Sequence, residues 1–304
     1  MIWLNKIDII ISHKNCQDGT GCVKIAQRFN AAMGYDKPEV VLLSYGKDGY
    51  FDTDRAEGKN VIIADYSFDR RTTEHLHEVT NNLLIVDHHV TAKGILKGLD
   101  YTIFDMDKCG ASLLWSTLFP KEEVPAIIGY IEDRDLWKHR LEDTDHVSYG
   151  LRLCPQHELV KLTPETFFAD EWLNSLKHNG GVVEISNKAY VAGKVSIDIS
   201  KNWRYATING VMGVVINNTH LLSETGNAAC VSYGVNYTIN YFITPKEIVF
   251  SLRSLGNFDV AELAATLGGG GHTNAAGCSI PIEEFDFGKF FGAGVIARKD
   301  AKDD

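Results

Sequence analysis

The sequence predicts an α/β protein: an N-terminal, mostly parallel sheet flanked by helices, linked by helices to a smaller α/β domain with a mixed sheet. Short apolar runs alternate with helix-like stretches in the first half of the chain, an alternation that is typical of a parallel sheet. The middle is predominantly helical, and after about residue 203 the chain is rich in β-like segments. We therefore expect an N-terminal domain over residues 1–157, a helical connector over 158–200 and a C-terminal domain over 201–304.

Four short apolar runs in the first half predict strands that are buried on both faces. They are residues 7–11, 40–43, 61–64 and 83–86. Helical spacing of apolar residues predicts helices over residues 21–34, 69–81, 110–120 and 124–141. Pro120 separates the last two.

Turn signals in the C-terminal region are typical of antiparallel strands. Asn209-Gly210 predicts a hairpin. Segment 237–254 predicts two strands joined by a turn at 244–247, and segment 257–271 predicts a helix that ends in a run of four glycines. These elements indicate a second, mixed sheet.

The bulk composition is that of an ordinary globular protein. Of 304 residues, 44% are hydrophobic and 23% are charged, so a sizeable core can be buried. The six cysteines include no CxxC pair, which favours free thiols in a reducing compartment. The sequence has no run of about 18 apolar residues, and its N-terminus lacks the features of a signal peptide. We therefore expect a cytoplasmic protein without a membrane segment.

The formal net charge is −10. Because neutralising DNA phosphates needs clustered Lys and Arg, this charge argues against a protein whose task is to grip long duplex DNA. It is compatible with a small anionic substrate held by metal ions and a few cations. We expect the partner to be a short oligonucleotide or another small phosphorylated molecule, and the sequence leaves a homodimer open.

Carboxylates and imidazoles follow the predicted strands. They are His13 and Asp18, Asp65, the tripeptide Asp87-His88-His89, and Asp133 and Asp135 at the end of a predicted helix. Ligands of open α/β sheets bind beyond the carboxyl ends of the strands, so we expect these side chains to share one rim. Such a set suits Mn²⁺ or Mg²⁺ better than a structural zinc. Two ions bridged by one carboxylate could lower the pKa of a water molecule and clamp a phosphate.

Each of these residues also has a structural alternative. Asp65 could cap a helix, and Asp18 could belong to a turn. Asp133 and Asp135 could form ion pairs with neighbouring arginines, and the tripeptide could lie in an exposed loop. Their recurrence at successive element ends favours the metal site.

With these motifs in this order, the sequence resembles the DHH phosphoesterase superfamily, which includes RecJ-type exonucleases, nanoRNA and pAp phosphatases, cyclic-dinucleotide phosphodiesterases and manganese pyrophosphatases. Motifs I to IV are represented by SHKNCQDGTGC, IIADYS, VDHHVTA and DRDLW. The DHH-associated C-terminal domain is represented by FSLRS and LGGGGHTNAAG. The resemblance covers nearly the whole chain and implies a catalytic N-terminal domain followed by a substrate-binding one.

The resemblance also implies a role for each matching residue. The metal ligands would be His13, Asp18, Asp65, His88 and Asp135. Asp65 would bridge two ions, Asp87 would orient the site, and His89 would face the substrate or the leaving group, so that these three are catalytic. Substrate phosphate would be bound by Arg253, Gly269, Gly270, Gly271 and His272.

Motif I departs from the family pattern. The family has His, then two carboxylates one residue apart, whereas here Asp18 is preceded by Cys16 and Asn15 where the earlier carboxylate is expected. Three outcomes stay open: Cys16 ligates as a thiolate, Asn15 ligates weakly, or the first ion binds only with substrate. A thiolate would favour Mn²⁺ or Zn²⁺ over Mg²⁺.

The leading hypothesis is a Mn²⁺-dependent phosphodiesterase that hydrolyses short oligonucleotides or small nucleotides with a water activated by two metal ions, with Mg²⁺ or another divalent ion as the alternative cofactor. A second hypothesis is a phosphoanhydride hydrolase of the exopolyphosphatase or pyrophosphatase type. A third is a nucleotide-binding protein whose metal site is impaired. Trp203, Tyr233 and Phe250 could stack on bases, although aromatic residues in strands more often belong to the core.

Overall fold

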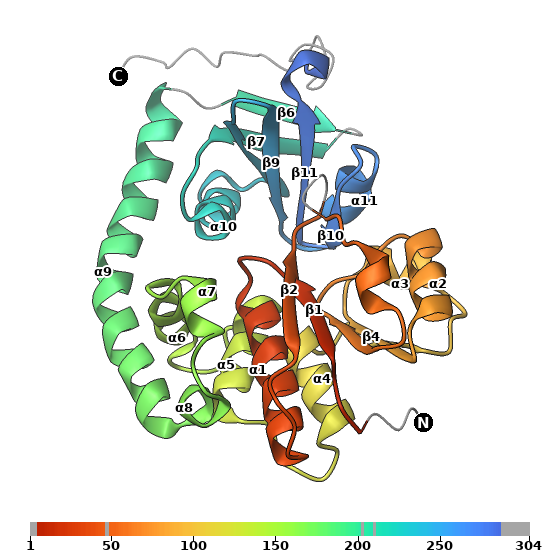
Figure 1. Ribbon diagram of the computed structural model, residues 1–304. Coiled ribbons are helices and arrows are strands. Elements are labelled where there is room, and N and C mark those ends of the chain that lie inside the picture. Colours follow the sequence, from red (N-terminus) through yellow and green to blue (C-terminus); the bar gives the residue numbers. More distant parts are fainter. Residues whose placement is uncertain (1–4, 46–48, 202–203, 209–210, 287–304) are drawn as a thin grey trace, which may run out of the picture. The chain divides into compact units, whose positions relative to one another are not determined.

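The computed structural model describes residues 5–45, 49–201, 204–208 and 211–286 (Figure 1). Its contacts divide the chain into two compact units, Met1–Ile185 and Ser186–Asp304. The first contains a parallel sheet and the second a mixed one, so the predicted fold class is confirmed. The division falls within a helix that occupies part of the expected connector, α9 (Asp170–Lys201).

The sheet of the first unit has five parallel strands in the order β2-β1-β3-β4-β5. The strands are β1 (Ile9–His13), β2 (Glu39–Leu43), β3 (Asn60–Ala64), β4 (Asn82–Asp87) and β5 (Thr102–Phe104). The four predicted strands are confirmed. The sequence did not reveal β5, because three half-buried residues are too few to form a pattern.

The first helices of this unit alternate with the strands, and those from residue 110 onward follow β5 without a strand between them. The helices are α1 (Gln17–Ala32), α2 (Arg70–Val79), α3 (Val90–Ile95), α4 (Gly110–Leu118), α5 (Ala126–Asp135), α6 (Thr144–Arg152), α7 (Gln156–Leu159), α8 (Pro164–Phe168) and the start of α9, together with the 3₁₀ turn η1 (Thr53–Ala56). Among the described residues, no helix combines the length and the apolar character needed to cross a membrane.

Both faces of the parallel sheet are covered. Since successive side chains of a strand point to opposite faces, Ile10 and Ile62 pack in one cluster with residues of α1, α4 and α5. Ile9 and Ile63 pack in another, which includes Leu76 of α2. Figure 1 shows α1 and α2 on different sides of the sheet. This burial on both faces explains the continuous apolar runs in the sequence.

The helix predicted over 124–141 is too long, since α5 ends at Asp135. Trp137 and His139 adopt positive φ angles of 54° and 46°, which a helix does not accommodate. The Asp133 carboxylate stabilises this irregular segment, because it accepts hydrogen bonds from the backbone N–H groups of Arg140 and Leu141 and from a threonine hydroxyl. Asp133 is therefore a structural residue.

The second unit is built on a six-stranded sheet of order β10-β11-β9-β8-β7-β6. The elements are β6 (Arg204–Ile208), β7 (Val211–Asn217), α10 (Leu222–Tyr233), β8 (Tyr237–Ile243), β9 (Glu247–Ser254), α11 (Val260–Ala265), β10 (Gly270–His272), β11 (Ala275–Pro281) and η2 (Ile282–Glu284). The parallel pair β7 and β8 is joined through α10, which the sequence did not reveal.

The predicted turn between β8 and β9 is confirmed: the N–H of Thr244 donates to the carbonyl of Glu247 at 2.8 Å, and the two strands pair in antiparallel register. The predicted turn residues Asn209 and Gly210 lie outside the described residues. The helix predicted before the glycine run is confirmed as α11, a short one.

Candidate metal centre

The functional side chains gather where three neighbouring strands end. His13 is the last residue of β1, Asp65 follows β3, and Asp87 is the last residue of β4. Because these strands are parallel and adjacent, their carboxyl ends lie at one edge of the sheet. Asp18 in the first turn of α1 and Asp135 at the end of α5 reach the same place.

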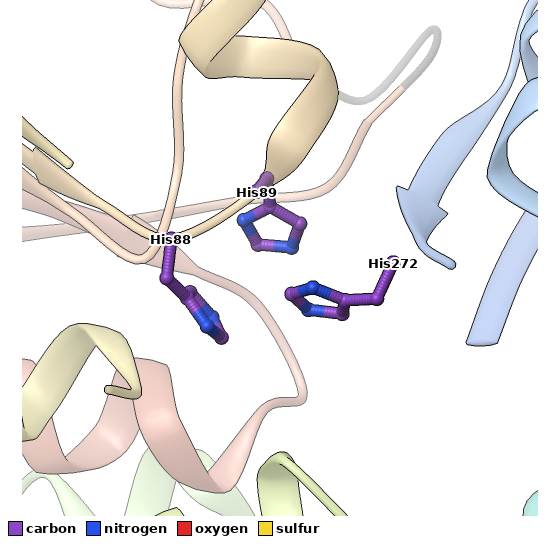
Figure 2. Close-up of side chains that lie close together, drawn as sticks. All are labelled: His88, His89 and His272. Atoms are coloured by element: carbon purple, nitrogen blue, oxygen red, sulfur yellow. The ribbon is translucent and has the colours of Figure 1, made fainter. Parts of the chain in front are cut away.

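His88 lies at the middle of this group. Its Nε2 atom is 3.5 Å from Asp18 Oδ2, 3.4 Å from Asp65 Oδ1 and 3.5 Å from Asp135 Oδ2. Figure 2 shows the His88 ring next to that of His89, both projecting from the residues that follow β4. The structure thus brings together four side chains that are separated by up to 117 positions in the sequence (135 minus 18).

Asp18 is held by the N-terminus of α4. Its two carboxylate oxygens accept hydrogen bonds from the backbone N–H groups of Gly110, at 2.6 Å, and Ala111, at 2.8 Å. The start of a helix favours a negative charge, which stabilises this buried carboxylate. A Cβ atom on Gly110 would lie 2.8 Å from the Cβ of Asp65, so this position requires glycine.

Asp65 adopts a positive φ of 55°. Such a backbone conformation is unfavourable for most residues, although Asp tolerates it better. Its two oxygens face different neighbours: Oδ1 lies 3.4 Å from His88 Nε2, and Oδ2 lies 4.0 Å from His13 Nδ1. Asp65 is therefore placed between two groups of candidate ligands.

The metal-free cluster holds more negative charge than a single imidazole can balance. Burial alone would lower the pKa of His88, but the hydrogen bond to Asp65 and the charges of Asp135 and Asp18 raise it to about 10. Burial and the charge of Asp18 raise the pKa of Asp65 to about 7 and that of Asp135 to about 6. Such repulsion between carboxylates in one small volume is relieved by a cation.

The residues fit a divalent cation. Among the described residues, nothing donates a hydrogen bond to Asp65 Oδ2 or Asp135 Oδ2, although both atoms are buried. Buried polar atoms are normally satisfied, so these two oxygens are free to bind an ion. Potential donor atoms of Asp18, His88 and Asp135 lie within 4.8 Å of one another, and so do those of His13, Cys16 and Asp65. Oxygen and imidazole donors of this kind suit Mn²⁺ or Mg²⁺.

The structure distinguishes between the two residues that replace the expected motif I carboxylate. Cys16 lies beside His13 and Asp65, whereas Asn15 is exposed and adopts a positive φ of 56°. Burial, and then the charges of Asp65 and Asp135, raise the pKa of the Cys16 thiol well above its usual value. Burial, and then the charge of His89, lower the pKa of His13 to about 4, so this imidazole is neutral and able to ligate.

Asp87 organises the DHH tripeptide. Its Oδ1 atom lies 2.7 Å from His89 Nδ1 and also accepts the backbone N–H of His88. The hydroxyl of Ser67 donates to its Oδ2 atom at 2.6 Å. Burial would raise the pKa of Asp87, but the charge of His89 and these hydrogen bonds hold it well below its usual range. Asp87 therefore fixes the orientation of the His89 ring seen in Figure 2.

Arg253 and His272, both predicted to bind phosphate, lie in the second unit. The guanidinium of Arg253 on β9 donates to the carbonyl of Leu252 and to the hydroxyl of Ser223, both at 2.6 Å. These contacts hold the side chain in one orientation. His272 is the last residue of β10 (Figure 2).

The glycine run has a structural role, part of which is to end the helix that the sequence predicts before it. The N–H of Gly269 donates to the carbonyl of Ala264 at 2.8 Å, which differs from our expectation that it contacts phosphate. A Cβ atom on Gly269 would lie 2.1 Å from the carbonyl of Gly277, and Gly271 has a φ of 144°. Helix ending and strand packing thus require these glycines.

Two aromatic residues that the sequence offered as stacking candidates make structural contacts within the second unit. Phe250 is buried in the core and packs against Phe285, and the hydroxyl of Tyr233 donates to the carbonyl of Val195. The suggestion of base stacking by Phe250 is therefore wrong. Trp203 lies outside the described residues.

Sequence reasoning missed three residues of the centre: Ser67, Gly110 and Gln156. The amide of Gln156 donates to the carbonyls of His13 and Cys16, and its oxygen accepts the N–H of Asn15. Ser67 lies two positions after Asp65 and could have been suspected from that proximity. Nothing local marks Gly110 or Gln156, because their partners are distant in the sequence.

Comparison with known proteins agrees with this fold. Residues 188–288 match the family model of the DHHA1 domain. A solved structure of the exonuclease RecJ bound to manganese is similar over 93% of this chain and 86% of that one, with a TM-score of 0.54 at 14% identity. The chain is therefore similar in fold to this exonuclease. A DHH domain from a member of the S1p family of ribosomal proteins is also similar, with a TM-score of 0.55 at 12% identity over 92% and 83% of the two chains.

One relative matches most of this chain in sequence. It is an uncharacterized protein of Acanthamoeba polyphaga mimivirus, which is 26% identical over 309 residues that include 93% of this chain and 71% of the relative. The similarity therefore includes both the parallel-sheet unit and the DHHA1 domain.

Proposed function

We propose that this protein is a metal-dependent phosphodiesterase that hydrolyses short oligonucleotides or small nucleotides and uses Mn²⁺. The convergence of Asp18, Asp65 and Asp135 around His88, within 3.5 Å, carries the proposal. The manganese in the similar RecJ structure supports the choice of ion. The formal net charge of −10 favours a short substrate over long duplex DNA.

The metal ligands would be His13, Cys16, Asp18, Asp65, His88 and Asp135. A bound pair of divalent cations would supply a water of lowered pKa and would offset the charge of the phosphate. Asp65 is the residue best placed to contact both ions, because its two oxygens face different groups.

The residues around the centre would position the substrate. Burial alone would lower the pKa of His89, but Asp87 raises it. With Nδ1 beside Asp87, His89 would direct its Nε2 atom to a phosphate oxygen or to the leaving group. In the second unit, we assign Arg253, His272 and the backbone of Gly270 and Gly271 to binding of substrate phosphate.

A hydrolysis panel tests the proposal. Dinucleotides, short RNA and DNA, pAp, cyclic dinucleotides, pyrophosphate and polyphosphate should each be incubated with the protein and Mn²⁺. We expect release of mononucleotide or phosphate from a nucleotide substrate, and a loss of about 100-fold or more in His88→Ala and Asp65→Asn. His75→Ala, at an exposed position of α2, is the matched control and should retain activity.

The panel also separates the alternatives. Turnover of pyrophosphate or polyphosphate alone would favour a phosphoanhydride hydrolase. Nucleotide binding without turnover, unchanged by Asp65→Asn, would favour a binding protein with an impaired centre and would overturn the proposal.

A further inference from the structure

An aromatic side chain outside the family motifs lies against the metal centre. Tyr45 comes shortly after β2, the edge strand next to β1. Its ring centroid is 5.5 Å from that of His13 and 5.8 Å from that of His89. Two of the imidazoles assigned to the centre therefore adjoin this one tyrosine.

Tyr45 is fixed from one side. It is stacked on Tyr66, with 4.8 Å between the ring centroids and 22° between the planes. Tyr66 is buried and packs edge-on against Phe68, which is also buried. These contacts determine both the position and the tilt of the ring.

The residue is nevertheless only partly covered. Tyr45 is 49% exposed, whereas Tyr66, directly beneath it, is 3% exposed. A tyrosine that served only the hydrophobic core would be covered like Tyr66 and Phe68. A rigid aromatic face that stays exposed beside a polar centre is instead suited to stacking on a flat, apolar ligand.

We propose that Tyr45 is a stacking platform for a nucleobase of the substrate, adjacent to the phosphate that the centre holds. A planar ring next to a phosphate-binding centre matches the chemistry of a nucleotide, because every base has a π-face that stacks on tyrosine. The inference adds a base-binding residue to the proposed function, and it rests on that function for the binding of the substrate phosphate. It excludes pyrophosphate and polyphosphate as preferred substrates, since they offer nothing to stack.

Binding of AMP and of ribose 5-phosphate in the presence of Mn²⁺, measured by titration calorimetry, tests the platform without requiring turnover. The wild-type protein should bind AMP more tightly than ribose 5-phosphate. Since stacking of one base is worth about 1–3 kcal/mol, Tyr45→Leu should weaken AMP binding by about five- to 150-fold. Binding of ribose 5-phosphate should be unchanged. Tyr45→Phe and Tyr45→Trp should both retain the preference for AMP.

Tyr35→Leu is the matched control. Tyr35 is 44% exposed and follows the C-terminal end of α1, whereas the centre lies at the N-terminal end of this 16-residue helix, about 24 Å away. This variant should bind both ligands as the wild type does.

Two results would overturn the platform. One is equal binding of AMP and ribose 5-phosphate by the wild type. The other is an equal loss of affinity for both ligands in Tyr45→Leu, which would show that the ring only supports His13 and His89.

Hydrolysis of a dinucleotide and of its abasic analogue then separates the platform from the phosphodiesterase. Turnover of both at the same rate would retain the phosphodiesterase and reject the platform. A Tyr45-dependent preference for AMP without any turnover would retain the platform and reject the phosphodiesterase.

Discussion

Gly110 shows how closely the centre is packed at the level of single residues. Its N–H holds Asp18, while its missing side chain leaves room for Asp65. Groups that orient metal ligands commonly affect metal affinity about 10- to 100-fold. The two carboxylates therefore depend on a residue that carries no functional group of its own.

Gly110→Ala should lower the affinity for Mn²⁺ by about tenfold or more, because the new Cβ would lie 2.8 Å from the Cβ of Asp65 and 3.0 Å from Asp18 Oδ2. Titration calorimetry with Mn²⁺ measures the effect, and circular dichroism establishes that the fold is retained.

The control is Gly129→Ala in α5, where a Cβ atom would meet nothing within 4 Å. This substitution should leave Mn²⁺ binding unchanged and should stabilise the helix by about 0.5–1 kcal/mol. Equal Mn²⁺ affinity in the two variants would show that Gly110 does not shape the centre.

At the level of elements, α1 begins at the candidate metal centre and is hydrogen-bonded to the segment that follows α7. Lys24 of α1 is completely buried, and its Nζ atom donates to the carbonyls of Val160 and Leu162 at 2.9 and 2.5 Å and to the side chain of Gln27 at 3.0 Å. Gln156, at the start of α7, holds the loop of His13 and Cys16. The loop that carries two candidate ligands is thus anchored through α7.

Lys24→Met should destabilise the protein by about 1–3 kcal/mol, because the carbonyls of Val160 and Leu162 lose their donor. Methionine has a helix propensity similar to that of lysine, so the change in stability reports on the lost hydrogen bonds. Urea denaturation measures the loss. Lys161→Met, at an exposed lysine paired with Glu158, should alter stability by less than about 0.5 kcal/mol. A loss in Lys24→Met no greater than in this control would contradict the anchoring role.

The ends of the elements were harder to predict than their existence. The four long strands and the main helices of the first unit follow from periodicity alone. The end of α5 at Asp135 does not, because it depends on hydrogen bonds from Arg140 and Leu141 back to Asp133. That early end places Asp135 at the terminus of a helix, beside His88.

In the molecule as a whole, the metal centre belongs to the first unit, and its charge couples metal binding to protons. The raised pKa of Asp65, about 7, means that the metal-free folded protein retains a proton that the unfolded chain releases near pH 4. His88, with a pKa of about 10, also retains a proton that the unfolded chain loses near pH 6.5. The stability of the metal-free protein therefore falls as the pH rises through these ranges, and a divalent ion that binds these ligands would have to displace the protons.

Mn²⁺ should consequently stabilise the protein more at pH 8 than at pH 6. Each displaced proton makes binding about tenfold tighter per pH unit, so we expect at least about a tenfold increase in affinity over this range. Thermal unfolding with and without Mn²⁺ at the two pH values measures the effect. Hydrogen exchange should show the added protection in β1, β3 and β4 and not in β8 and β9. An affinity independent of pH would contradict the proton coupling.

The sequence by itself determined the α/β class, four of the five strands of the first unit and the polar residues at the ends of these elements. Its resemblance to the DHH superfamily implied His13, Asp18, Asp65, His88 and Asp135 as candidate ligands. These features are local: a buried strand has a continuous apolar run, and a polar residue at its end is visible beside it. Only the tertiary structure decided the packing of Gly110 against Asp65, the placing of Cys16 rather than Asn15 beside His13, and the exposed face of Tyr45. Each depends on contacts between segments far apart in the chain, which no local pattern records.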